Sequence, residues 1–254
     1  TDAFSLQIED EARLSGLPAD VVATARATAE KAGRPGWTLT LKMPCYLPVQ
    51  TYADDRGLRE ALYRASGVRA SEQGPATLDN SGHIDRILAL RTELAALLGF
   101  ASYADYSLAT KMAKSPAEVL GFLRDLAGRA LPFARRDRME LEAFARDELG
   151  IDDLQPWDVA YASDKLKQAR YGYSGQEVKR YFTEPRVLAG LFDVIESLYG
   201  VRVREDEAPT WHADVRFFRV EDRDGRLLGQ FYLDLYAREG KRGGAWMDDC
   251  RNRR

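Results

Sequence analysis

The chain has 254 residues and is 45% hydrophobic, so it can bury one sizeable core or two smaller ones. Its 37 Lys and Arg residues are balanced by 40 Asp and Glu residues, which leaves no electrostatic footprint for nucleic acid. No apolar run approaches the ~20 residues that a membrane span needs, and the acidic N-terminus lacks the basic region of a secretory signal. We therefore expect a cytoplasmic protein that binds neither nucleic acid nor a membrane, with Cys45 and Cys250 favoured as free thiols over a disulfide.

Helical patterns dominate the chain before residue 200, where we expect seven or eight helices. The clearest segments combine apolar residues at helical spacing with capping residues at their ends, and they are 18–32, 54–69, 80–98, 115–150, 174–181 and 185–199. Two of these helices begin at capping boxes, in which a serine hydroxyl accepts a hydrogen bond from the third helical N–H: SPAE at 115–118 and SGQE at 174–177. Pro132 is expected to kink or break the helix that the first box starts.

Strand patterns appear beyond the last of these helices. Segments 215–220 and 227–236 are rich in aromatic and β-branched residues, and the Asp-Gly dipeptide at 224–225 is the strongest short hairpin signal in the chain. Shorter segments at 201–203 and 243–247 would complete a small antiparallel sheet.

One short strand is also expected near the N-terminus, at residues 37–43, where bulky and polar residues alternate. Pro44 and Pro48 then bracket an extended segment. The layout as a whole is mainly α with a small C-terminal antiparallel β-sheet, an α+β arrangement. We divide it into a helical region, 1–200, and a β-hairpin segment, 201–254.

Few residues carry a catalytic pattern on their own. His83 and His212 are the two histidines, and neither begins a His-Glu-x-x-His motif, in which two histidines bind zinc and the glutamate acts as a base. His83 should be exposed in the first turn of a helix, and His212 should pack or lie at the surface. Asp248 and Asp249 are adjacent, so on an extended chain their carboxylates point to opposite sides. We therefore expect no catalytic residue and no metal ligand within this chain.

The stretch Arg242, Gly243, Gly244 and Ala245 is the candidate for a binding site. Small residues let another backbone approach closely, which a site requires when it grips an extended peptide by strand addition. A tight turn or a β-bulge is the simpler explanation from the residues alone. Both explanations stay open at this point.

Several blocks of the sequence resemble one known family. The blocks FYLDLYAREGKRGGAWMDD, at 231–249, and WHADVRFF, at 211–218, resemble the oligopeptidase A branch of the thimet-oligopeptidase family of zinc metallopeptidases. The blocks PCYLPV, RASEQG, LATKMA and LQPWD look like the same family and follow in the expected order. The resemblance therefore covers nearly the whole chain, from about residue 4 to residue 250.

The resemblance implies part of a zincin-like oligopeptidase fold that cleaves short peptides. Residues 1–200 would form part of the cleft wall, and residues 201–254 would border the catalytic cleft, where 242–245 offer backbone to the substrate. In the family a helix with His-Glu-x-x-His follows such a segment, and the chain ends before one. We therefore expect no zinc in this chain and no activity from it alone. A non-catalytic helical module that binds peptides or a protein partner, and one half of a split enzyme, are the alternatives.

The resemblance also implies an uncovered surface. In the family this region packs on the catalytic helices, so the face made by Phe231, Leu233, Leu235 and Trp246 would be partly exposed here. The strand edge near 243–245 would offer unpaired backbone groups to an extended chain. We therefore expect self-association, or capture of a peptide, along that edge.

Overall fold

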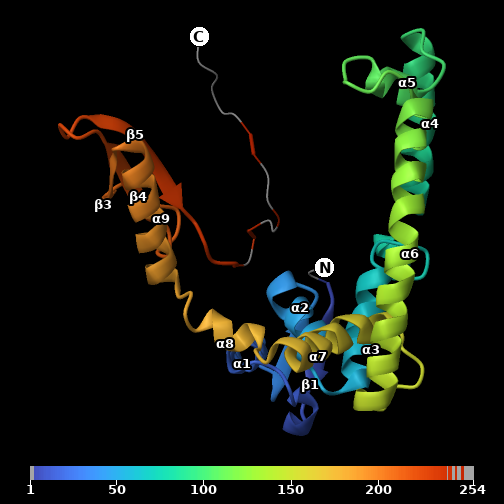
Figure 1. Ribbon diagram of the computed structural model, residues 1–254, viewed down its shortest axis with the longest axis horizontal. Helices are drawn as coiled ribbons and strands as arrows, with labels where there is room; N and C mark the ends of the chain where they lie inside the picture. Colours follow the sequence, from blue (N-terminus) through green and yellow to red (C-terminus); the bar gives the residue numbers. More distant parts are fainter. Residues whose placement is uncertain (1–2, 239, 242–243, 245–246, 249–254) are drawn as a thin grey trace. The chain divides into compact units, whose positions relative to one another are not determined.

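The computed structural model of the chain describes residues 3–238, 240, 241, 244, 247 and 248 (Figure 1). They fall into two compact units, Thr1–Gly172 and Tyr173–Arg254. Helices dominate the chain, and each unit holds one small antiparallel sheet. The predicted fold class, mainly α with a small C-terminal antiparallel sheet, is confirmed. Within the described residues, no helix has both the length and the apolar character that crossing a membrane requires.

The first unit begins with a two-stranded sheet that the sequence patterns did not fully predict. Strand β1, Ser5–Ile8, pairs antiparallel with β2, Trp37–Thr40, and helix α1, Ala19–Lys31, packs on β2. The predicted strand at 37–43 is therefore present but ends at Thr40. The core beneath it consists of Ile8, Leu14, Ala25, Trp37, Leu39, Leu41, Val49, Ala53, Leu58 and Leu62.

The segment that follows is helical, so the prediction of an extended segment bracketed by Pro44 and Pro48 is wrong. Helix α2 spans Met43–Tyr52. Pro44 lies in its first turn, where the missing N–H costs nothing. Pro48 removes one hydrogen bond from the helix interior, but the next residue, Val49, is fully buried and α2 packs against α1, α3 and α7. Tertiary burial therefore outweighs the local cost of one proline.

Five more helices complete the first unit: α3 (Arg56–Gly67), α4 (Ser81–Leu97), α5 (Tyr103–Leu108), α6 (Pro116–Leu149) and α7 (Val159–Tyr171). Helix α6 begins as the capping box predicts, because the Ser115 hydroxyl accepts a hydrogen bond from the Glu118 N–H at 3.2 Å. It then continues through Pro132, so the predicted break does not occur. One missing hydrogen bond is a small loss in a helix of 34 residues.

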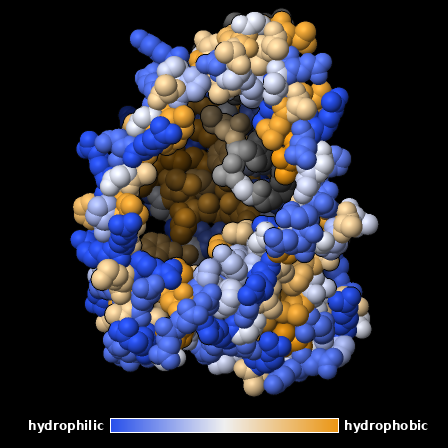
Figure 2. Space-filling model, turned by 90° about the vertical axis from the view of Figure 1, so that its right-hand side faces the viewer, coloured by the Kyte–Doolittle hydropathy of each residue, from blue (hydrophilic) through white to orange (hydrophobic). Residues whose placement is uncertain are grey.

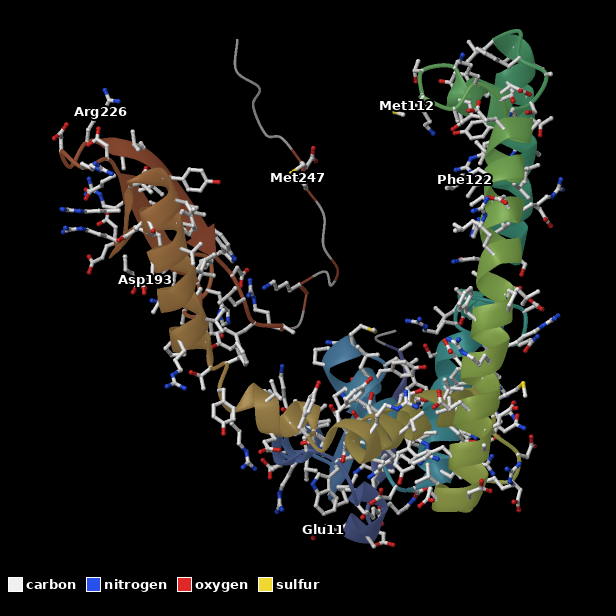
Figure 3. The ribbon with its side chains drawn as sticks, viewed as in Figure 1. Glu11, Met112, Phe122, Asp193, Arg226 and Met247 are labelled. Atoms are coloured by element: carbon white, nitrogen blue, oxygen red, sulfur yellow. The ribbon has the colours of Figure 1, made fainter. Side chains whose placement is uncertain are left out.

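Burial along α6 is confined to its C-terminal end. Leu141 and Ala145 of α6 pack with Leu154 and with Ala162 of α7 in a second small core. Every residue from 120 to 140 is exposed, and most of α4 is exposed as well. Apolar side chains therefore reach the surface in several places (Figure 2), and Phe122 and Met112 are examples in Figure 3.

The described residues of the second unit form two helices and a three-stranded sheet. Helices α8 (Gly175–Lys179) and α9 (Glu184–Tyr199) precede strands β3 (Arg202–Asp206), β4 (Arg216–Glu221) and β5 (Leu227–Leu233), which pair antiparallel in the order β3-β4-β5. The Ser174 hydroxyl caps α8 as predicted, by accepting from the Glu177 N–H. The predicted hairpin is also confirmed: Gly225, at φ +82°, lies between β4 and β5.

Aromatic packing joins α9 to one face of this sheet. Phe218 of β4 is opposite Phe231 of β5, and Phe192 of α9 lies against both rings, 5.2 Å from Phe218 between centroids. Helices α8 and α9 thus belong to the same compact unit as the strands, although the composition changes after them. The functional division at residue 200 stays a prediction. The strand expected at 243–247 falls largely outside the described residues.

Candidate functional site

The candidate site is the chain that leaves the end of β5, because it leads into the predicted binding stretch. Gly244 belongs to the described residues, whereas Arg242, Gly243 and Ala245 lie outside them. Gly244 is exposed and has a φ of +104°, a conformation that residues with a Cβ rarely adopt. A Cβ added there would meet no atom within 4 Å. The open space around Gly244 leaves its backbone approachable.

Asp234, the residue directly after β5, is the centre of a polar cluster that we call the Asp234 cluster: Asp234, Trp211, Arg238 and Lys241. The Arg238 guanidinium donates to both carboxylate oxygens of Asp234, at 2.6 and 2.7 Å. The Trp211 indole N–H donates to one of them at 3.1 Å, and the Lys241 ammonium lies 3.0 Å from the other. Four donor groups from three side chains therefore converge on one carboxylate.

Electrostatics at this carboxylate favour its charged form. The hydrogen bonds from Arg238 are the largest cause, and together with those from Lys241 and Trp211 they hold the pKa of Asp234 far below its usual range. In return, the carboxylate raises the pKa of Arg238. The Asp234 carboxylate is therefore ionised at neutral pH, and its pair with Arg238 persists well into acid.

Lys241 also binds the backbone of the segment that follows β5, which we call the turn after β5. Its ammonium donates to the carbonyl oxygen of Asp234 and, at 3.0 Å, to that of Tyr236. Contacts between Asp234 and Lys241 thus join the two ends of this turn. Because Lys241 directly precedes the predicted binding stretch, the cluster ends where that stretch begins.

A hydrogen bond from Tyr236 connects the turn after β5 to the start of α9. The Tyr236 hydroxyl donates to the carboxylate of Glu184, the first residue of α9, and the pKa of Tyr236 is raised by that carboxylate. Arg216 on β4 lies 3.5 Å from Glu184 and makes a close bidentate pair with Glu205 on β3. A continuous network of charged and polar side chains therefore connects α9, the β3-β4-β5 sheet and the turn after β5.

An aromatic row supports Trp211 on the sheet face opposite α9. The Trp211 ring lies 5.1 Å from that of Tyr232, which in turn lies 4.7 Å from Phe217. Centroid distances in this range are favourable for tilted aromatic pairs. The row fixes the indole so that its N–H faces Asp234.

Neither of the two histidines is a member of the Asp234 cluster. His83 is exposed in the first turn of α4, as expected, and His212 is exposed beside Asp214, whose N–H it accepts at 3.2 Å. Asp248 is exposed, and Asp249 lies outside the described residues. Across the part of the chain that the structure describes, no group of three or more His, Cys, Asp or Glu side chains is placed to hold a metal. The donor set of these residues therefore does not fit a zinc site.

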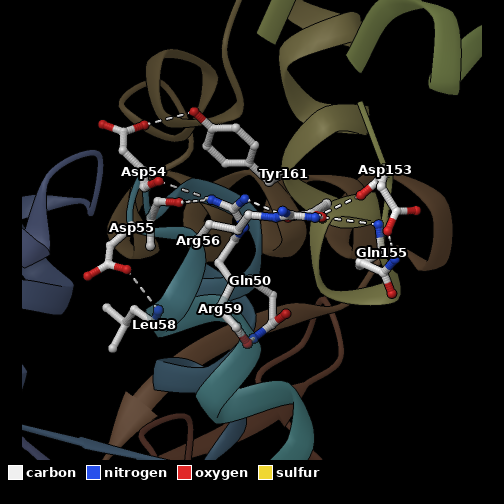
Figure 4. Close-up of polar contacts among 11 residues, drawn as sticks. Gln50, Asp54, Asp55, Arg56, Leu58, Arg59, Asp153, Gln155 and Tyr161 are labelled. Carbon is white, nitrogen blue, oxygen red and sulfur yellow. Dashed lines mark hydrogen bonds and ion pairs between the residues drawn. The ribbon is translucent and has the colours of Figure 1, made fainter. Parts of the chain in front are cut away.

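A second polar cluster, in the first unit, is buried and connects segments far apart in sequence (Figure 4). The carboxylate of Asp158 is fully buried and accepts from Arg56 at 2.7 to 3.1 Å and from Arg59 at 2.7 Å. Arg59 is itself 1% exposed, and it stacks on the ring of Tyr161 and donates to the Ala53 carbonyl. The cluster joins α3 to the turn before α7.

The chemistry of this buried cluster indicates a structural role and not a catalytic one. Burial alone would raise the pKa of Asp158, but hydrogen bonds from Arg56, Arg59 and the Gln155 N–H lower it overall. The carboxylate is thus held ionised with all its acceptor sites engaged, and it is enclosed by the protein. It has neither the accessibility nor the free lone pairs of a general base.

Sequence reasoning missed both clusters, although each contains residues of the quoted blocks. Asp234, Arg238 and Lys241 lie in FYLDLYAREGKRGGAWMDD, and Asp158 ends LQPWD. The spacing of four residues between Asp234 and Arg238 gave no signal, because it predicts pairing on a helix and this segment is not helical. Asp158 offered no local signal either, since its partners lie 102 and 99 residues away.

Comparisons with known proteins match the chain over nearly all of its length. The model described as Peptidase family M3 matches residues 49–254. Oligopeptidase A from Escherichia coli strain K12 is 52% identical over 253 residues, which cover 98% of this chain and 37% of that protein. The probable cytosolic oligopeptidase A of Arabidopsis thaliana is 38% identical over 267 residues, covering 100% of this chain and 37% of the relative. The dipeptidyl carboxypeptidase of Escherichia coli strain K12 is 32% identical over 245 residues, with 95% of this chain and 36% of the relative covered.

The chain therefore spans 33% to 37% of the length of the oligopeptidase A proteins that it matches.

Proposed function

Since the chain belongs to peptidase family M3, we propose that it forms an interior part of a zinc-dependent oligopeptidase that hydrolyses short peptides. The observation that carries this proposal is the 52% identity to oligopeptidase A over 98% of the chain. The alignment extends through both compact units, so the proposal does not depend on one short motif.

Within that enzyme, the chain contributes binding surface. Residues 1–200 form part of the cleft wall, and residues 201–254 border the catalytic cleft. Arg242, Gly243, Gly244 and Ala245 offer main chain to an extended substrate, in the manner of strand addition. The exposed position of Gly244 and its positive φ support this assignment, because a small residue there leaves the backbone accessible.

Zinc and its ligands come from residues outside these 254. Zinc supplies a polarised carbonyl and an activated water in peptide hydrolysis, and the His-Glu-x-x-His motif that holds it in the family does not occur here. The residues of this chain therefore bind and orient the peptide, and the chain alone is inactive.

Two proteins test the proposal side by side. The purified 254-residue chain should bind no stoichiometric zinc and should not cleave internally quenched short peptides. A longer polypeptide that contains these residues followed by a His-Glu-x-x-His helix should bind one zinc and cleave the same peptides, with loss of activity on chelation. Chelator-sensitive turnover by the short chain after removal of contaminants, or an inactive but zinc-loaded long polypeptide, would contradict the proposal.

We also propose that the 254-residue chain self-associates along the strand edge near residues 243–245. Leu235 is half exposed, and Phe231 and Leu233 are partly buried, whereas Trp246 lies outside the described residues. β5 pairs on one side with β4, and no strand of the described residues pairs with its other side. An open edge of this kind can pair with another extended chain.

A further inference from the structure

We propose that the N-terminal half of α6 is a docking surface for another helix of the longer M3 polypeptide, one with an apolar face and acidic residues at the borders of that face. The occupant belongs to the part of that polypeptide outside these 254 residues. The proposal rests on membership of family M3 and not on peptidase activity, so it can fail while the proposed function stands.

The docking surface is an apolar stripe, which we call the α6 stripe. Its large side chains are 47–66% exposed, and they are Leu120, Phe122, Leu123, Leu126, Leu131 and Phe133. Spacings of three and four residues place them on one side of the helix. The interval from Leu123 to the buried Leu141 corresponds to about five full turns, so the stripe lies on the face that packs with α7 further along. Asp137 and Arg138 separate the exposed part of this face from the buried part.

Within the described residues, no other element covers the α6 stripe. Helix α6 makes extended contact with α7, near its buried end, and a smaller contact with α5. Helix α4, which has exposed apolar residues of its own, packs on α5 and makes no comparable contact with α6. Figure 1 shows α4 and the N-terminal half of α6 extending away from the rest of the first unit. Because most helical stability in proteins comes from packing of an apolar face, the exposed stripe indicates a missing neighbour.

Arginines border the α6 stripe on both sides. Arg124 and Arg135 lie at one border, each one turn after a leucine of the stripe. Arg129 and Arg136 lie at the opposite border, and Arg136 stacks on the ring of Phe133. Segment 120–139 holds five arginines against two aspartates, so the surface is basic. A complementary helix therefore carries Asp or Glu at the positions that flank its own apolar face.

The coverage of the relatives supports the same polypeptide as the source of this helix. The match to oligopeptidase A takes in 98% of this chain but 37% of that protein, so most of the longer polypeptide is available to pack here. Side chains at three- and four-residue spacing form ridges that fit the grooves of a second helix. A second copy of this chain fits less well, because it would bring arginines against arginines across the contact.

Thiol labelling tests the contact, because a cysteine beneath a packed helix reacts slowly. Leu123→Cys places the thiol in the α6 stripe, and the control Gly128→Cys places it on the opposite side of α6, where an added Cβ meets no atom within 4 Å. Each substitution is made in the 254-residue chain and in a longer polypeptide that contains these residues. Cys45 and Cys250 are replaced by alanine in every protein, and circular dichroism checks that each one folds.

The Leu123→Cys thiol should react at least about 100-fold more slowly in the longer polypeptide than in the 254-residue chain. The Gly128→Cys thiol should change by less than about 10-fold. Equal rates for Leu123→Cys in the two proteins, or equal protection of both positions, overturn the proposal. Protection of Leu123→Cys in the 254-residue chain that rises with its concentration would assign the stripe to a second copy, and overturns it as well.

Two further measurements complete the test. In the longer polypeptide, Arg124→Glu and Arg135→Glu together should raise the labelling rate of Leu123→Cys about 10-fold, whereas Arg146→Glu, at the exposed C-terminal end of α6, should leave it unchanged. An unchanged rate in the double variant would contradict an acidic occupant. Amide hydrogen exchange on the two unsubstituted proteins needs no variant: residues 120–131 should be protected in the longer polypeptide alone, and fast exchange there in both proteins overturns the proposal.

Discussion

Asp158→Asn should destabilise the first unit strongly, because it removes the charge on which Arg56 and Arg59 converge. Asp158 is 0% exposed and Arg59 is 1% exposed, so the substitution leaves a buried guanidinium without an anionic partner. Breaking a buried pair in this way costs about 3–5 kcal/mol. With a urea m-value of about 2–3 kcal/mol per M, the unfolding midpoint should fall by about 1–2.5 M.

Urea unfolding of the 254-residue chain, followed by circular dichroism and tryptophan fluorescence, measures this shift. The matched control is Glu30→Gln, which removes one partner of the Arg26–Glu30 pair on α1, where both side chains are about two-thirds exposed. That change should cost at most about 0.5 kcal/mol. Arg56→Met should fall between the two, because the Arg56 side chain is 46% exposed.

The dependence on pH gives the decisive test. The pKa of Asp158 is lowered in the folded chain, so its stabilisation is complete above the usual carboxyl value of 3.8 and is lost as the pH falls through the lower folded value. The difference between the unsubstituted chain and Asp158→Asn should therefore be full at pH 7 and should shrink below pH 3.8. A difference under 1 kcal/mol at pH 7, or one that grows in acid, would refute the reasoning.

Three further outcomes are expected. Ser115→Ala should lower the free energy of unfolding by about 1 kcal/mol, because α6 loses its N-terminal cap. Unchanged far-UV helicity near pH 7 checks that α6 still forms, and no loss of stability would show that the cap does not stabilise the chain. Phe218→Ala should lower the free energy of unfolding by about 3–5 kcal/mol, because this ring is 2% exposed and lies between two other rings. The control Leu227→Ala, at an exposed position, should cost under about 0.5 kcal/mol. Equal effects of the two substitutions in denaturant titrations would contradict the described packing. Gly244→Val should weaken self-association in sedimentation, since the side chain blocks close backbone approach; an unchanged dimerisation constant would place the contact elsewhere, such as on the exposed apolar residues of α4.

Local features of the sequence predicted the parts of the fold that local physics decides. The serine hydroxyls at 115 and 174 accept the capping bonds that their spacing indicated, and Asp224-Gly225 turns the chain between β4 and β5. In each case the residues that make the contact lie within a few positions of one another. The family resemblance predicted the membership that the M3 match confirms.

Contacts between distant residues decided the rest. Two prolines within six residues indicated an extended segment, yet burial of Val49 against neighbouring helices holds it as α2. The pairing of Asp158 with Arg56 and Arg59 links positions about 100 residues apart and has no local pattern. The candidate site shows the same limit: the binding stretch was named from its small residues, whereas the Asp234 cluster beside it depends on how β5 ends.

The uneven burial of α6 has a consequence for its dynamics. Only the C-terminal end of this helix packs in a core, while residues 120–140 are exposed on all sides. Amide hydrogens after Leu141 should then exchange only when the first unit opens, whereas those before Pro132, where the hydrogen-bond ladder is already interrupted, should exchange through fraying of the helix alone. One continuous helix would thus contain two separate exchange regimes, with the transition between the proline and the first buried leucine.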